Sequence, residues 1–148
     1  MMKLYLAGSL FSEADITQRK KEGTLLSDHF PDATIVNPID QPFNQQRQSL
    51  PTPLAIFDGD AEEIMNCDVF IADITNEDPG VMLAIGIAIS HLPKIIIAIN
   101  SDSRINTASQ YQIPSYGMNH FVLGAIQKHG HLVSSFEEAI TLLKEMTK

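Results

Sequence analysis

DVFIADITNEDPGVMLAIGIA, residues 68–88, contains a short apolar segment, a polar turn and a second apolar segment in immediate succession. The first segment, Asp68–Asp73, has the near-continuous apolar character of a strand buried on both faces. The turn from Thr75 to Gly80 leads into Val81–His91, which predicts an apolar helix that ends before Pro93. A buried strand followed directly by a buried helix is typical of a parallel sheet covered by helices.

The same alternation extends in both directions along the chain. Strands are predicted at residues 3–8, 33–36, 94–99 and 131–133, and helices at residues 12–30, 53–66, 116–127 and 136–146. This order predicts an α/β fold: a Rossmann-like or flavodoxin-like doubly wound sheet of about five parallel strands, with helices on both faces. With 148 residues we expect a single domain, residues 1–148. The polar, proline-punctuated segment 37–52 is predicted to be a long loop that covers a substrate.

Composition restricts the classes of partner. Ten Lys and Arg against 18 Asp and Glu give a formal net charge of −8, which disfavours nucleic acid and anionic membranes. The basic run Arg19-Lys20-Lys21 is interpreted as the solvated face of a helix. The longest apolar run, Ile95–Ile99, is far shorter than the ~20 residues of a membrane span. With one cysteine, Cys67, and no signal-peptide pattern, we expect a soluble cytoplasmic protein that acts on a small molecule.

Right-handed crossovers place the carboxyl ends of all strands at one edge of the sheet, where such folds bind ligands. The turn after the first strand, Gly8-Ser9, lacks both dinucleotide and P-loop signatures, and the five histidines form no metal-binding pair. No cofactor and no metal are therefore predicted. Asp73 and Asp78 lie at this edge, whereas Asp58 and Asp60 also fit a simpler interpretation as charges near a helix N-terminus.

Three parts of the chain carry a resemblance to a known family. These are the first strand with Tyr5, the segment from Asp60 to Asp73, and the segment from Asp78 to Ala88. Together they resemble the nucleoside 2-deoxyribosyltransferase family, and the similarity extends to Asn119. The family motif has Asp and Gly in the turn, followed by Glu-x-Gly-x-Ala in the helix. Here the frame is kept, but Ala84 stands where the family has glutamate.

The resemblance implies exchange of the base on a 2′-deoxyribonucleoside through a covalent deoxyribosyl-enzyme. It assigns Ala84 to the nucleophile position, Asp78 to the acid that serves the leaving base, Asp60 to substrate contact, and Tyr5 to holding the nucleophilic carboxylate. The expected ligands are 2′-deoxyribonucleosides and free nucleobases, and the expected binding residues are Gly8, Phe11, Phe43, Gly80 and Asn119. In the family this Asn comes from a neighbouring subunit, which implies a homo-oligomer, a dimer or larger.

Several alternatives stay open at this point. Alanine at position 84 has three alternative explanations. The chain is a deliberately inactivated variant, or it is a natural relative that kept binding and lost transfer, or another carboxylate, Asp60, Glu62 or Glu63, has taken over the role of the glutamate. The alternative functions are an N-glycosidase of 2′-deoxynucleoside 5′-monophosphates and a non-catalytic nucleoside-binding protein. As purely structural alternatives, Tyr5 belongs to the core, Asp78 to a turn, and Asn119 to a helix cap.

Overall fold

A five-stranded parallel sheet forms the centre of the computed structural model, which describes residues 1–45, 51–104 and 117–148. The strand order is β2-β1-β3-β4-β5, and every neighbouring pair is parallel. This is the flavodoxin-like order, in which the chain reverses direction across the sheet at β1 and β3. The strands are β1 (Lys3–Ala7), β2 (Thr34–Val36), β3 (Val69–Asp73), β4 (Ile95–Ile99) and β5 (His131–Val133).

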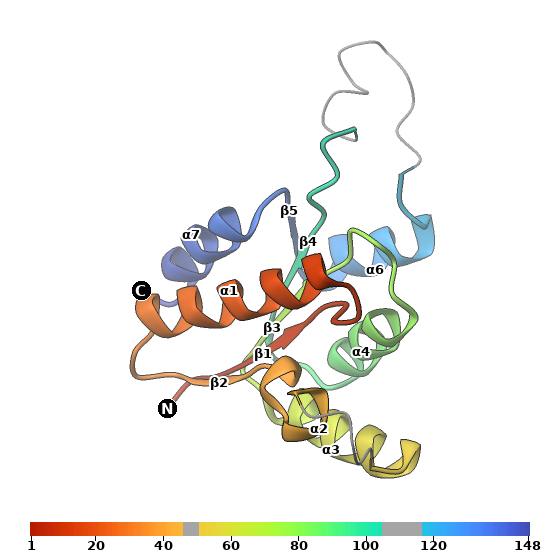
Figure 1. Ribbon diagram of the computed structural model, residues 1–148. Helices are drawn as coiled ribbons and strands as arrows, with labels where there is room; N and C mark the ends of the chain where they lie inside the picture. Colours follow the sequence, from red (N-terminus) through yellow and green to blue (C-terminus); the bar gives the residue numbers. More distant parts are fainter. Residues whose placement is uncertain (46–50, 105–116) are drawn as a thin grey trace.

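Helices cover both faces of the sheet (Figure 1). The described helices are α1 (Glu13–His29), η1 (Pro38–Asp40), α2 (Pro42–Gln45), α3 (Pro53–Asn66), α4 (Pro79–Ser90), α6 (His120–His129) and α7 (Phe136–Met146). Helices α1 and α7 lie on one face, and α3, α4 and α6 lie on the other. The predicted doubly wound α/β fold is therefore confirmed. No helix in the described ranges is both long and apolar enough to cross a membrane.

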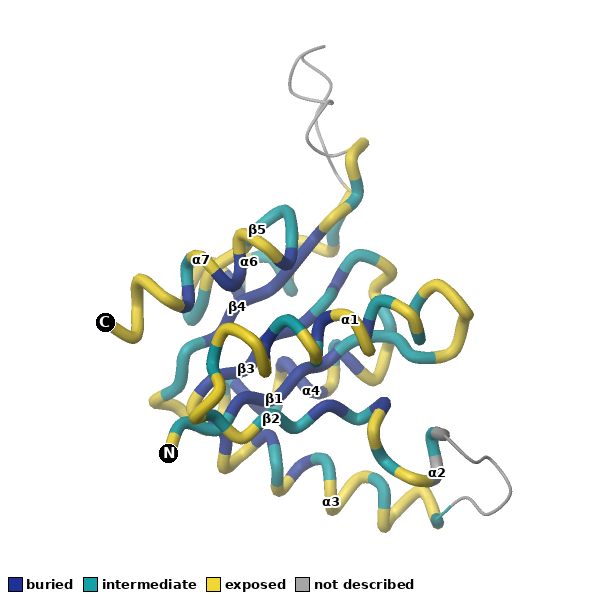
Figure 2. Tube along the Cα trace, turned by 60° about the vertical axis from the view of Figure 1, so that its left-hand side comes forward, coloured by how far each residue is buried: buried dark blue, intermediate teal, exposed yellow. Residues whose placement is uncertain are grey.

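Side chains of β1 alternate between the two faces of the sheet and contribute to a separate hydrophobic cluster on each face. Leu4 and Leu6 are completely buried and pack with Leu26 of α1 on one side. Tyr5 and Ala7 point to the other side, into the cluster formed with α3, α4 and α6. In Figure 2, β1, β3 and β4 are buried strands in the middle of the molecule. The carboxyl end of β1 therefore presents its side chains to α3 and α4.

Three sequence-based boundaries differ from the structure. Within the segment predicted as a loop, residues 37–52, the chain forms η1 and α2, while residues 46–50 lie outside the described part. Helix α6 begins at His120 because the Asn119 side chain caps it, and the expected start at residue 116 lies outside the described residues. Helix α4 begins at Pro79, since proline suits the first helical turn and Asp78 supplies the cap.

The interpretation of Arg19 as part of a solvated helix face is wrong, because its side chain is only 2% exposed. Its guanidinium contacts Glu22 within α1 at 2.8 Å and Asp73 at the end of β3 at 2.7 Å. Burial alone would raise the pKa of Asp73, but hydrogen bonds from Arg19 and Thr75 outweigh it and lower that pKa. Burial raises the pKa of Glu22 in spite of the adjacent guanidinium. This ion-pair network fastens α1 to the ligand-binding edge of the sheet.

Gly8 has no side chain, and the Arg19 guanidinium occupies the space that a side chain at this position would fill. A Cβ atom added at Gly8 would lie 1.6 Å from Nη1 and 2.5 Å from Cζ of Arg19. The first turn after β1 therefore tolerates no side chain while the guanidinium keeps its position.

We predict that Gly8→Ala lowers the free energy of unfolding by about 1–3 kcal/mol, because the methyl group displaces the buried guanidinium. Gly59→Ala is the matched control, since Gly59 is exposed within α3 and nothing lies within 4 Å of an added Cβ. There alanine should raise the free energy of unfolding by about 0.5–1 kcal/mol. Urea unfolding of both variants measures the difference, and equal effects of the two substitutions would contradict the packing argument.

Candidate active site

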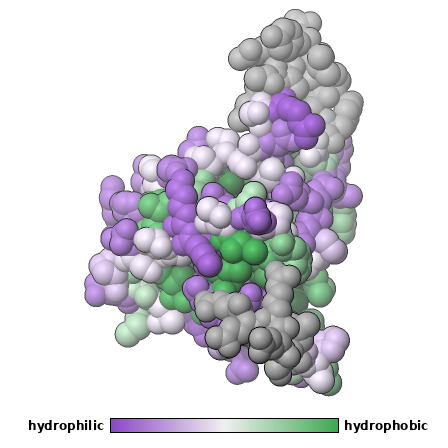
Figure 3. Space-filling view, in the orientation of Figure 1, coloured by the Kyte–Doolittle hydropathy of each residue, from purple (hydrophilic) through white to green (hydrophobic). Residues whose placement is uncertain are grey.

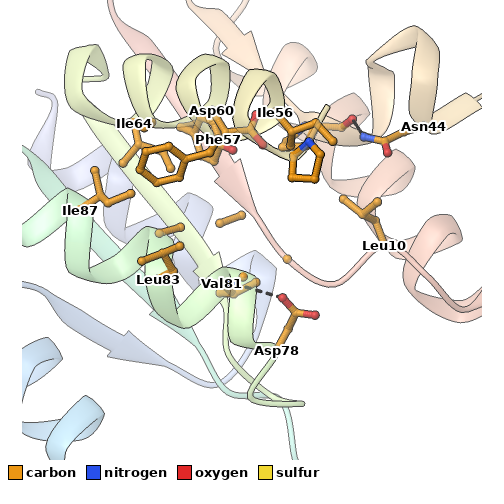
Figure 4. A pocket seen from close by; sticks show the side chains of 18 of the residues that line it. Leu10, Asn44, Ile56, Phe57, Asp60, Ile64, Asp78, Val81, Leu83 and Ile87 are labelled. Atoms are coloured by element: carbon orange, nitrogen blue, oxygen red, sulfur yellow. Dashed lines mark hydrogen bonds between the residues drawn. The ribbon is translucent and has the colours of Figure 1, made fainter. Parts of the chain in front are cut away.

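A cavity of about 510 Å³ lies between α3 and α4, beside the carboxyl end of β1. Figure 4 shows Ile56, Phe57 and Ile64 of α3 across the cavity from Val81 and Leu83 of α4. Its size and apolar walls are those of a small-molecule site. On the face of the molecule in Figure 3, hydrophobic surface is gathered in the middle and bordered by hydrophilic side chains.

Most of the sequence-predicted site residues line this one cavity. They come from three separate segments of the chain, which the parallel topology brings to the same edge. The residues concerned are Tyr5, Gly8, Phe11, Asp60, Asp78, Gly80 and Ala84. Among the described lining residues the only ionisable groups besides the Tyr5 phenol are the carboxyl groups of Asp60 and Asp78, and no Lys, Arg or His is present.

Asp60 enters the cavity from α3 and faces Tyr5 of β1. The Tyr5 ring is stacked on Phe70 with centroids 5.9 Å apart, which holds the phenol in place. Burial raises the pKa of Tyr5, and the charge of Asp60 raises it further. Burial also raises the pKa of Asp60, although its hydrogen bond with the Tyr5 hydroxyl acts in the opposite direction. A carboxyl group with a raised pKa in an apolar cavity is suited to hydrogen bonding or proton transfer with a ligand.

Asp78 stands at the opposite wall as the N-cap of α4. Its Oδ2 accepts a hydrogen bond of 3.0 Å from the Val81 backbone N–H, the dashed line in Figure 4. The partial positive charge of the helix N-terminus stabilises this carboxylate. A Cβ atom added at Gly80 would lie 3.1 Å from the same oxygen, so glycine keeps the space beside it open.

Ala84 lines the cavity on α4, six positions after Asp78, and is 8% exposed. Its methyl group provides neither a nucleophile nor an acid. Two of the proposed substitute carboxylates, Glu62 and Glu63, do not line the cavity, because Glu62 is exposed and Glu63 pairs with Lys3. Only Asp60 of that group faces the space beside Ala84.

Two predicted residues lie elsewhere. Asn119 is exposed, and its side-chain oxygen accepts hydrogen bonds from the N–H groups of Phe121 and Val122 at the start of α6. Within one chain it does not reach the described cavity wall. A role in the site of another copy stays a prediction. Phe43 belongs to α2, and its side chain lies outside what the structure describes.

Sequence reasoning missed much of the apolar wall. On α3, Ile56 lies four residues before Asp60 and Ile64 lies four residues after it. That helical spacing around Asp60 is the signal that identifies them. The same helical spacing marks Val81 and Ile87, which lie three residues before and after Ala84 on α4, whereas Leu10 and Asn44 lie outside α3 and α4 and carry no such signal.

The sequence model of a family described as nucleoside 2-deoxyribosyltransferase matches residues 4–143. An uncharacterized protein of Ureaplasma parvum serovar 3 is 26% identical over 159 aligned positions, which cover 99% of this chain and 98% of the relative.

Three solved structures share the fold. A conserved protein from Enterococcus faecalis V583 has a TM-score of 0.84 at 24% identity, covering 99% of both chains. A 2-deoxyribosyltransferase from Bacillus psychrosaccharolyticus has a TM-score of 0.66 at 17% identity, covering 93% of this chain and 90% of the other. A CMP N-glycosidase from Clostridium botulinum has a TM-score of 0.60 at 19% identity, covering 97% and 98%.

We predict that Asp60→Asn raises the free energy of unfolding at pH 7. The raised pKa of Asp60 means that the folded chain binds its proton more tightly than the unfolded chain, so the charged form opposes folding. This penalty is present above the raised pKa and disappears as the pH falls below the unfolded value of about 3.9. The increase in the free energy of unfolding caused by Asp60→Asn should therefore be smaller at pH 3.5 than at pH 7.

Denaturant unfolding at the two pH values measures this change. Asp58→Asn is the control, because Asp58 is exposed on the same helix. A gain from Asp60→Asn that is equal at both pH values, or equal to that of the control, would contradict the burial of the Asp60 charge.

Proposed function

Because this chain belongs to the nucleoside 2-deoxyribosyltransferase family, we propose that its cavity binds 2′-deoxyribonucleosides and free nucleobases. The observation that carries the proposal is the meeting of Asp60, Asp78 and Ala84, three positions matched by the family resemblance, around one apolar cavity. The volume of about 510 Å³ is adequate for a nucleoside, and the apolar walls offer contact to the planar base.

In the proposed reaction each acidic residue has a separate task. Asp78 serves the leaving base by hydrogen bonding or proton transfer, and the N-terminus of α4 holds its carboxylate in place. Asp60, with the Tyr5 hydroxyl beside it, binds polar groups of the substrate. Transfer through a covalent deoxyribosyl-enzyme requires a carboxylate at the anomeric carbon, and Ala84 has none. We therefore propose that this chain retains binding and is severely impaired in transfer.

A second candidate is an N-glycosidase of nucleoside 5′-monophosphates, since a CMP N-glycosidase shares the fold. A phosphate group requires cationic or other strong donors. The described cavity wall has two carboxylates and no Lys, Arg or His, so its charge repels an anionic ligand. This distribution of charge favours the uncharged nucleoside.

We also propose that the chain forms a homo-oligomer in which Asn119 approaches the site of another copy. The support is the exposure of Asn119 at the start of α6, next to Phe121, whose side chain is 90% exposed.

We predict that Ala84→Glu establishes base exchange at a rate about 10⁴–10⁶-fold above that of the unaltered chain, because it supplies the missing nucleophile. Chromatography of a mixture of one 2′-deoxyribonucleoside and a second free base measures the exchange. Ala84→Gln is the matched control, with nearly the same shape and no carboxylate. A glutamate variant that is folded, binds nucleoside and exchanges bases no faster than the glutamine variant would refute the assignment of position 84.

A further inference from the structure

Glu77, immediately before Asp78, has a backbone φ of 50°, in the left-handed region. Non-glycine residues adopt this region rarely, and they keep it only where the surrounding structure holds them there. Among the described residues Glu77 is the only non-glycine residue with a positive φ. The turn that leads to the cavity acid is therefore under constraint.

Two hydrogen bonds hold Glu77 in this conformation. Its backbone N–H donates to the Ile74 carbonyl oxygen at 3.1 Å, which closes the turn. Its side-chain Oε1 accepts from the backbone N–H of Asn119 at 3.0 Å, 42 residues further along the chain. The start of α6 is thereby connected to the turn that precedes α4, and the Glu77 charge lies near a helix N-terminus, where it is favoured.

The turn between β3 and α4 begins after Asp73, and a separate set of hydrogen bonds holds that end of the turn. Asp73 Oδ1 accepts from the Thr75 hydroxyl at 2.7 Å and from the Thr75 N–H at 3.1 Å. The Thr75 hydroxyl in turn accepts from the Ser101 N–H at 3.0 Å. The start of the turn is thus held by Asp73 and Thr75, and the residue before Asp78 is held by the contact between Glu77 and Asn119.

We propose that Glu77 is a positioning residue for the candidate active site: its contact with the Asn119 N–H maintains the left-handed turn that directs the Asp78 carboxylate into the cavity. Glu77 is absent from the described cavity wall and acts through Asp78. The effect on ligand affinity rests on the proposed function, whereas the effect on the geometry of Asp78 does not.

The experiment compares Glu77→Ala, which removes the acceptor, with Glu77→Gln, which keeps an oxygen at the same position. Glu62→Ala controls for the loss of an exposed carboxylate, because Glu62 lies on α3 outside the cavity wall. Amide hydrogen exchange of the full chain, measured by NMR, reports on two N–H groups: Asn119, which donates to Glu77, and Val81, which donates to Asp78.

In Glu77→Ala we expect both amides to exchange about fivefold faster or more, while the amides of β3 and β4 and the global free energy of unfolding stay nearly unchanged. Calorimetric affinity for a 2′-deoxyribonucleoside should fall by about fivefold to tenfold in the same variant. Glu77→Gln and Glu62→Ala should stay within about twofold of the unaltered chain in both measurements.

An unchanged exchange rate of the Val81 amide in Glu77→Ala would overturn the proposal. A Val81 amide that exchanges as fast in Glu77→Gln as in Glu77→Ala would also overturn it. If the unaltered chain binds no nucleoside, the proposed function fails, and the exchange of Val81 still decides the role of Glu77. If nucleoside binds equally well to all variants, Glu77 does not position Asp78 for the ligand.

Discussion

The ion pair between the buried Arg19 guanidinium and Asp73 is the contact on which the carboxyl edge of the sheet depends. It joins α1 to the end of β3, requires glycine at position 8, and holds the start of the turn that leads to Asp78. The Asp73 side chain is 21% exposed and Arg19 also pairs with Glu22, so loss of Asp73 would leave the guanidinium with one remaining carboxylate partner. The lowered pKa of Asp73 shows that the pair stabilises the fold above the unfolded pKa, and this contribution is lost as the pH falls through the folded value.

The cavity combines two carboxyl groups in different surroundings. Asp78 is stabilised by a backbone N–H and a helix N-terminus, whereas burial raises the pKa of Asp60 in an apolar wall. Two carboxyl groups on opposite walls of one cavity are able to contact different parts of the same ligand. Ala84 lies in the same wall, at the position that the family resemblance assigns to the nucleophile. This arrangement supports the proposal that the chain binds a nucleoside and is impaired in transfer.

The regular elements of this chain could be predicted because their sequences have clear periods. The limits of α3 and α7 agree with their sequence patterns, since Pro53 and Ser135 mark the starts. Arg19 could not be placed, because in a run of three basic residues nothing distinguishes a side chain whose partner lies 54 residues away. The joint position of Asp60, Asp78 and Ala84 was accessible through the family resemblance, whereas the lining residues Leu10 and Asn44 followed only from the three-dimensional structure. The left-handed position in the turn is occupied by Glu77 rather than by glycine or by the adjacent Asn76, so the residue types did not indicate it.

The central claim is that the cavity between α3 and α4 accepts an uncharged 2′-deoxyribonucleoside and leaves it intact. Calorimetric titration of the unaltered chain with a 2′-deoxyribonucleoside and with its 5′-monophosphate, followed by chromatography of the ligand, tests this directly. We expect one nucleoside per chain, an intact glycosidic bond, and at least about tenfold weaker binding of the monophosphate, because the wall carries two carboxylates and no described cation. Absence of nucleoside binding, or tighter binding of the monophosphate, would contradict the claim.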